Sequence, residues 1–439
     1  MKSLSTVLLL LSLTTFSHAS LTLSETSEKP AENLAHYLNG LLDEGIDLQC
    51  IRSASGFQCL KEDFTVVKTD EENVTARTHF DRLELLFRKE IAPYFEKNRF
   101  DAAMREYRRA EKARQTRKRS GRGAAKPVPT PQKDAMDRAL WRTLDRMVLK
   151  NLRIDVSHPA TRTFVKEVVF ENRMTNLGGK TVYSDRIFGT LSLRYRDFVL
   201  DTNATSDSAY TTMTRRLERW LETNDTKRAE YVAKKLRQLS AKRMKSPTSG
   251  KFVLKTRYIG NDSLSLRFLA ASRDGIGDRS DFSFDGEVHH LRSMFNPKEK
   301  EVQVGAPDFL FLSMHLQTDT NNTTYRHLLA HDRRFHRYIA DYDDLIRARY
   351  DEKMKRYAKN PVVAGWLKQA KKAFSKVLRG EAKSIVLSVK NRTGATAMQL
   401  VGAVIAQLSV MPQKGEKPDR EKLILDTAAA NLDVRIEAE

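Results

Sequence analysis

Two histidines of this 439-residue chain have the spacing of a metal-binding pair. His327 and His331 stand one helical turn apart in HLLAH, and histidines at positions i and i+4 of a helix can bind one zinc ion. The zinc-enzyme motif HExxH also needs a glutamate, whereas Leu328 and Leu329 follow the first histidine here. The pattern is therefore more typical of an ordinary helix surface, and we predict no metal site and no cofactor.

A second stretch is rich in carboxylates. Residues 273–286, RDGIGDRSDFSFDG, contain four aspartates and three glycines. They lack the alternation of a calcium-binding EF-hand loop, so turns are the favoured interpretation. The sequence contains no nucleophile elbow, phosphate-binding loop or dinucleotide-binding motif. We therefore predict a non-enzymatic binding or scaffold protein, with no catalytic residue; a hydrolase with an unfamiliar site is an alternative.

The two cysteines, Cys50 and Cys59, lie in DLQCIRSASGFQCLKED, which has the pattern strand, turn, strand. If the hairpin is centred on Ala54 and Ser55, the cysteines face each other, and facing strand residues have Cα atoms about 4.5–5.5 Å apart. This spacing predicts a disulfide bond, and two buried free thiols are the alternative. Neither interpretation is catalytic, because the sequence has no CxxC motif.

The N-terminus predicts export. Lys2 precedes an apolar stretch at 4–16, and small residues stand at Ser17 and Ala19, which is the layout of a signal peptide at residues 1–19. The apolar stretch is too short for a membrane-spanning helix, which needs about 20 residues. We expect an exported protein without a transmembrane segment after cleavage, located in the periplasm or associated with the cell envelope.

The charge balance indicates an anionic partner. The chain has 77 Lys and Arg against 56 Asp and Glu, a net charge of +21. Candidate partners are lipid headgroups, acidic envelope polymers and an envelope protein; export disfavours nucleic acid. The basic segment 104–133 is the candidate docking site, although a solvated linker would have the same composition. Its predicted surface-binding residues are Arg114, Arg117, Lys118, Arg119 and Arg122.

Seven Asn-x-Ser/Thr sequons occur, and in four an acidic residue stands two places before the asparagine. This pattern resembles the extended acceptor of bacterial N-linked oligosaccharyltransferases. The resemblance covers only five residues at each place, and capping of helix N-termini by Asn, Asp and Thr explains the same residues. The glycosylation candidates are Asn73, Asn203, Asn224 and Asn321.

Three of these sequons belong to an internal repeat. The stretches EENVT, DTNAT and DTNNT begin at residues 71, 201 and 319, and each follows a strand-like run and precedes a helix-like pattern. Two further hairpins are predicted at 252–269 and, from the Asp-Gly pair, at 282–288. We predict an α+β fold of tandem diverged repeats, in which amphipathic helices pack on antiparallel strands and hairpins in an elongated multi-unit architecture.

The predicted boundaries follow from the repeat. They are 32–120 for repeat 1, 121–134 for a basic, proline-rich linker, 135–245 for repeat 2, 250–360 for repeat 3 and 361–439 for an incomplete terminal repeat. Curved sheets covered by amphipathic helices can also enclose an apolar groove, so a carrier of an amphiphilic, lipid-like ligand is the second functional hypothesis. The sequence predicts neither the identity of the ligand nor an oligomeric state.

Overall fold

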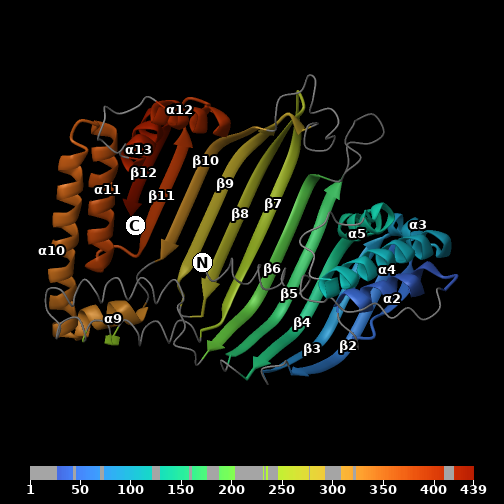
Figure 1. Cartoon of the computed structure of the whole chain (residues 1–439). Coiled ribbons are helices and arrows are strands. Elements are labelled where there is room, and N and C mark those ends of the chain that lie inside the picture. Colours follow the sequence, from blue (N-terminus) through green and yellow to red (C-terminus); the bar gives the residue numbers. More distant parts are fainter. Residues whose placement is uncertain are drawn as a thin grey trace. The chain divides into compact units, whose positions relative to one another are not determined.

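The structure is a computed structural model, shown in Figure 1. It describes residues 27–42, 46–69, 74–120, 129–157, 161–175, 187–202, 231, 234–235, 246–275, 277–291, 308–319, 323–409 and 420–439. The predicted signal peptide and all four glycosylation candidates, Asn73, Asn203, Asn224 and Asn321, lie outside the described residues.

Twelve strands lie in one sheet in chain order, and the described neighbouring pairs are antiparallel. A mixed fold of helices on antiparallel strands is therefore confirmed. The strands are β1 (Gln49–Ser53), β2 (Gly56–Thr69), β3 (Thr75–Arg88), β4 (Leu144–Val156), β5 (Thr161–Thr175), β6 (Phe188–Thr202), β7 (Thr248–Gly260), β8 (Ser263–Asp274), β9 (Arg279–His289), β10 (Asp308–Asp319), β11 (Ser384–Asn391) and β12 (Leu432–Ala438).

Nine α-helices and one 3-10 segment occur among the described residues. They are α2 (Pro30–Leu42), η1 (Lys89–Ile91), α3 (Ala92–Phe95), α4 (Lys97–Ser120), α5 (Pro131–Thr143), α9 (Thr323–His331), α10 (Arg333–Arg356), α11 (Pro361–Leu378), α12 (Ala397–Ser409) and α13 (Arg420–Asn431). The chain divides into two compact units, which comprise residues 1–173 with 193–204 and residues 174–192 with 205–439.

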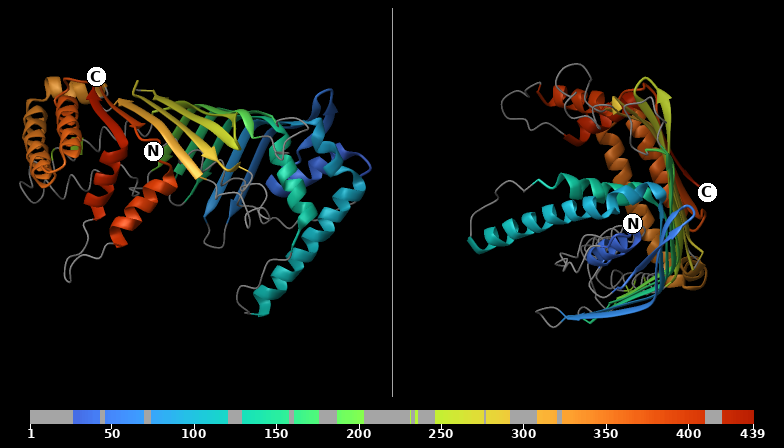
Figure 2. Two further views of the ribbon diagram at one scale, coloured as in Figure 1. Left: turned by 90° about the horizontal axis from the view of Figure 1, so that it is seen from above. Right: turned by 90° about the vertical axis from the view of Figure 1, so that its right-hand side faces the viewer.

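In the first unit, α2, α4 and α5 lie on one face of strands β1 to β5 (Figure 2). Aromatic rings fill the space between the helices. The ring of Tyr37 meets those of Phe95 and Phe100 edge-on, with centroids 5.9 and 6.3 Å apart, and all three side chains are buried. Leu34 and Met104 complete this core. Burial of such large apolar side chains is the main source of stability for the helix layer.

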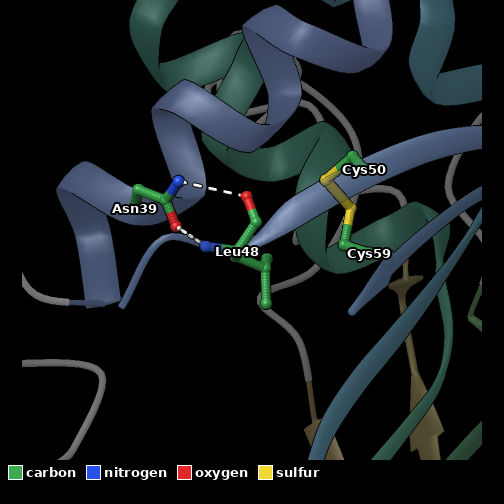
Figure 3. Close-up of a disulfide and its surroundings, with 4 residues drawn as sticks. All are labelled: Asn39, Leu48, Cys50 and Cys59. Carbon is green, nitrogen blue, oxygen red and sulfur yellow. Dashed lines mark hydrogen bonds between the residues drawn. A yellow bond between two sulfur atoms is a disulfide. The ribbon is translucent and has the colours of Figure 1, made fainter. Parts of the chain in front are cut away.

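The cysteine hairpin forms as predicted. Cys50 of β1 stands directly opposite Cys59 of β2, and the two are joined by a disulfide (Figure 3). Beside it, the Asn39 side chain of α2 donates to the carbonyl of Leu48 at 3.1 Å and accepts from its N–H at 2.7 Å. The amide of Asn39 thus pairs with the backbone as a neighbouring strand would, and this ties α2 to the start of β1.

The prediction of a helix directly after Asn73 is wrong. Residues 75–88 form β3, which pairs with β2 on one side and β4 on the other. The spacing of the apolar residues in this segment fits both the 3.6-residue period of a helix and the two-residue period of a strand. In the structure every second residue, Leu83, Leu85 and Phe87, is buried, as a strand requires. Asn73 therefore stands between two strands, and the first copy lacks the predicted strand-to-helix junction.

The strand-to-helix junction is present in the third copy, and the second copy does not test it. In the third copy β10 ends at Asp319 and α9 begins at Thr323, which is the predicted order of strand and helix. In the second copy β6 ends at Thr202, and the residues that follow lie outside the described part. Equivalent repeats are therefore not confirmed, and the proposed repeat boundaries stay a prediction.

The second hairpin prediction is also wrong. Strand β9 runs without a turn through Asp285 and Gly286, whereas the hairpin of β7 and β8 forms with Tyr258 opposite Leu264. A Cβ atom on Gly286 would stand 2.8 Å from the Phe309 ring of the adjacent strand β10. Glycine is thus required here for close packing against Phe309, and the Asp-Gly pair is not a turn signal.

In the second unit, α10 and α11 form an antiparallel helical hairpin, and α11 packs on β12 (Figure 1). Both helices have side-chain caps. The carboxylate of Asp332 accepts the N–H of Phe335 at 3.0 Å, and the Asn360 side chain accepts the N–H of Val363 at 3.1 Å. Pro361 then occupies the first turn of α11, where its missing N–H costs nothing.

Candidate functional site

The candidate site is the cationic helix α4 of the first unit. Residues 97–120 contain ten Lys and Arg against three Asp and Glu, and they are rich in residues of high helix propensity. Phe100, Ala103 and Met104 are buried, so one side of the N-terminal half packs into the core of the unit. This packing holds a highly charged helix that propensity alone would stabilise only weakly.

Exposed cations gather on another side of the same helix. Arg105, Arg108, Arg109 and Lys112 are exposed, and their spacing of i, i+3, i+4 and i+7 puts them on one face. The predicted surface-binding residues do not include these four, although their helical period is the signal in the sequence that identifies them. We call Arg105, Arg108, Arg109 and Lys112 the cationic face.

Four of the five predicted surface-binding residues lie on a helix of the first unit. Arg114, Arg117, Lys118 and Arg119 belong to α4, so they lie on a helix and not on a flexible tether. Arg122 lies outside the described residues. Helix α5 begins at Pro131. The Cα positions along a helix have a fixed spacing, which those of a flexible tether do not have.

Contacts with α5 fix the position of α4. The carboxylate of Glu106 accepts the backbone N–H groups of Gln132 and Lys133 at 2.8 and 3.2 Å, at the positive end of the α5 dipole. The ammonium of Lys133 lies 5.7 Å from the centre of the Tyr107 ring and pairs with Asp137 at 2.6 Å. Acidic and aromatic residues of α4 thus face α5, which leaves the cationic face open.

The hydroxyl of Tyr37 also reaches α5, where it donates to Asp137. Burial, followed by the negative charge of Asp137, raises the pKa of Tyr37 well above its usual range. Tyr37 therefore remains a neutral donor at physiological pH, and α2, α4 and α5 form one supported layer.

The two histidines of HLLAH stack on each other, with ring centroids 4.2 Å apart. The side chain of His331 contacts the backbone carbonyl of His327 at 3.0 Å. Within the described part of the chain, no group of three or more His, Cys, Asp or Glu residues could hold a metal ion.

A buried carboxylate joins the two long helices of the second unit. Asp343 of α10 is fully buried and accepts from Ser375 at 2.9 Å and from the guanidinium of Arg379 at 2.5 Å. The hydrogen bond to Asp343 raises the pKa of Arg379. The Arg379 side chain is 38% exposed, so the pair joins a buried carboxylate to a cation at the surface and ties the end of α11 to α10.

No family model, curated protein or solved structure matches this chain. No helix in the described ranges is both long enough and apolar enough to cross a bilayer.

Proposed function

We propose that this protein is an exported, non-enzymatic binding or scaffold protein that attaches to an anionic surface of the cell envelope. The observation that carries the proposal is the division of α4 into two sides. Phe100 and Met104 anchor the helix in the core, while Arg105, Arg108 and Arg109 are exposed to solvent. A supported helix of this kind presents cations at fixed spacing without ordering a flexible chain on binding.

Exposed apolar residues of the second unit favour a lipid surface among the anionic candidates. Helix α12 contains no charged residue, and Met398 and Val401 are 61% and 54% exposed on it. Exposed apolar side chains of a short helix can enter the boundary between headgroups and acyl chains, whereas a soluble acidic polymer offers them no apolar phase. A basic protein with such a helix therefore suits an anionic bilayer.

Flotation with lipid vesicles tests this proposal. The chain from Ser20 onward should float with vesicles that contain phosphatidylglycerol, and not with neutral phosphatidylcholine vesicles. Retention should weaken between 0.1 and 1 M salt, because the Debye length falls from about 10 Å to about 3 Å. Failure to bind the anionic vesicles at low salt would contradict the proposal.

The lipid assignment has its own test. The double change Met398→Ser and Val401→Ser should reduce vesicle retention and leave binding to a soluble acidic polymer unchanged. Ile51→Ser is the matched control, since Ile51 is 62% exposed on β1 and has no part in the argument. Equal retention of the α12 variant and the control would favour an acidic polymer or protein as the partner.

Export and modification are tested on protein isolated from the native cells. N-terminal sequencing should begin at Ser20, and fractionation should place the protein in the periplasm or with the envelope. Peptide mass spectrometry should reveal glycans at Asn73, Asn203, Asn224 or Asn321 if the acidic sequons are acceptors, whereas unmodified peptides would contradict glycosylation.

A further inference from the structure

The second unit contains an apolar groove that the proposed attachment through α4 does not use. Residues of helices α10 and α11 line it, together with one residue each of α13 and β12. Its volume is about 510 Å³, within the usual range of about 300–1,000 Å³ for small-molecule sites. The lining residues are Ile346, Arg349, Tyr350, Lys353, Val363, Trp366, Leu367, Ala370, Phe374, Leu425 and Ile436.

The inner part of the groove is aliphatic. Val363 and Ala370 of α11 are buried, and Leu425 and Ile436 approach from α13 and β12. Toward the opening, the rings of Tyr350 and Phe374 stack with centroids 6.4 Å apart, although Phe374 remains 41% exposed. The helical hairpin has therefore left apolar surface that its own side chains do not cover.

The only charged residues in the lining are cations. Arg349 and Lys353 stand one turn apart on α10, on the same side as Ile346 and Tyr350. Lys353 makes a 3.4 Å ion pair with Glu421, and both side chains are about half exposed. Arg349 is exposed and has no ion-pair partner within the described part of the chain. An anion at the opening would supply one.

Three features determine which ligand suits this groove. An aliphatic interior takes a hydrocarbon chain, and the unpaired guanidinium of Arg349 can bind a carboxylate in bidentate geometry. Burial raises the pKa of Tyr350, so its phenol stays neutral and adds no competing negative charge. A cationic amphiphile would meet only repulsion from Arg349 and Lys353.

We propose that this groove binds a single-chain anionic amphiphile of the fatty-acid class. The acyl chain lies along Val363, Leu367 and Ala370, and the carboxylate pairs with Arg349. The groove is preformed, because Arg379 pairs with Asp343 and Lys371 with Asp351 across the two helices, so little ordering accompanies binding.

Fluorescence titration of the delipidated full chain with dansyl-undecanoate tests the site. Binding should saturate, palmitate should displace the probe, and dodecyltrimethylammonium should not. Arg349→Gln should weaken binding about tenfold, the scale expected for a charge-assisted hydrogen bond. Arg337→Gln, an exposed cation of the same helix outside the groove, is the matched control and should bind as the parent does.

A second variant tests the acyl-chain site. Ala370→Phe should fill the groove and abolish binding, with circular dichroism as the check on folding. No saturable binding by the parent, or unchanged binding by both variants, would overturn the proposal. Loss with Ala370→Phe but not with Arg349→Gln would refute the carboxylate assignment. Either variant should still float with anionic vesicles through α4, so failure here is distinguishable from failure of the proposed function.

Discussion

The cationic face of α4 can be removed without disturbing the core beneath it. We consider the fourfold change of Arg105, Arg108, Arg109 and Lys112 to Gln. All four side chains are exposed, and Gln has nearly the helix propensity of Arg and Lys. Exposed substitutions of this kind usually change stability by less than about 0.5 kcal/mol each. The variant should therefore fold, with a net charge four units lower than that of the parent.

The expected loss of binding follows from the helix geometry. The four residues span seven helical steps, which is about 10 Å along the axis. This span is comparable to the Debye length of about 10 Å at 0.1 M salt, so a surface touching the face would interact with all four charges. Each basic residue near an anionic membrane contributes about 1 kcal/mol. Removal of four should cost up to about 4 kcal/mol, or roughly a thousandfold in affinity.

The assay is vesicle flotation at 0.1 M salt, with a control of equal charge. Changing Arg52, Arg77, Arg146 and Lys150 to Gln removes the same charge from exposed positions on β1, β3 and β4. The α4 variant should lose most of its binding, and the control should lose little. Equal losses would show that net charge alone carries the binding. Parental binding by the α4 variant would refute the role of the helix.

Three further predictions concern the fold. Changing Cys50 and Cys59 to Ser should lower the free energy of unfolding by about 3 kcal/mol, the loop-entropy effect of so short a ring, and unfolding in urea measures it. Asp343→Asn should lower the free energy of unfolding by about 2 kcal/mol in the same measurement, because Arg379 and Ser375 lose the negative charge of the carboxylate that they donate to; Asp344→Asn, at a side chain 69% exposed, is the control and should change little. Burial raises the pKa of Tyr195 to about 12, so this residue stabilises the folded state fully below pH 10, and the contribution is lost as pH rises from about 10 to 12. Thermal unfolding across that range should show a fall in stability that is about 2 kcal/mol smaller in Tyr195→Phe than in the parent, because Tyr37 and Tyr350 also titrate there, and an unchanged pH profile in this variant would contradict the assignment.

Predictions from the sequence succeeded where neighbours along the chain decide the structure. The cysteine hairpin depends on a turn of two residues between Ser53 and Gly56, so its register follows from local spacing. Strand β10 likewise coincides with the strand-like run predicted before DTNNT. In each case the local sequence pattern fits the observed secondary structure and fits the alternative poorly.

Prediction failed where the pattern suits two structures. The apolar residues of β3 fit a helix or a strand, and pairing with β2 and β4 on both sides stabilises the strand. At Gly286 the decisive neighbour is Phe309, which belongs to another strand. The density of cations in α4 was evident from the sequence, but the extent of the helix and its exposed face depend on burial of Phe100 and Met104.

The sequence by itself determined the excess of positive charge, the pairing of Cys50 with Cys59 and the predicted signal for export, since each depends on composition or short spacing. Only the tertiary structure decided which cations are exposed on α4 and that an apolar groove exists at all. Ile346, Trp366 and Ile436 come from separate elements and line the same groove. Burial depends on contacts between such distant segments, so no local pattern in the chain could specify the groove.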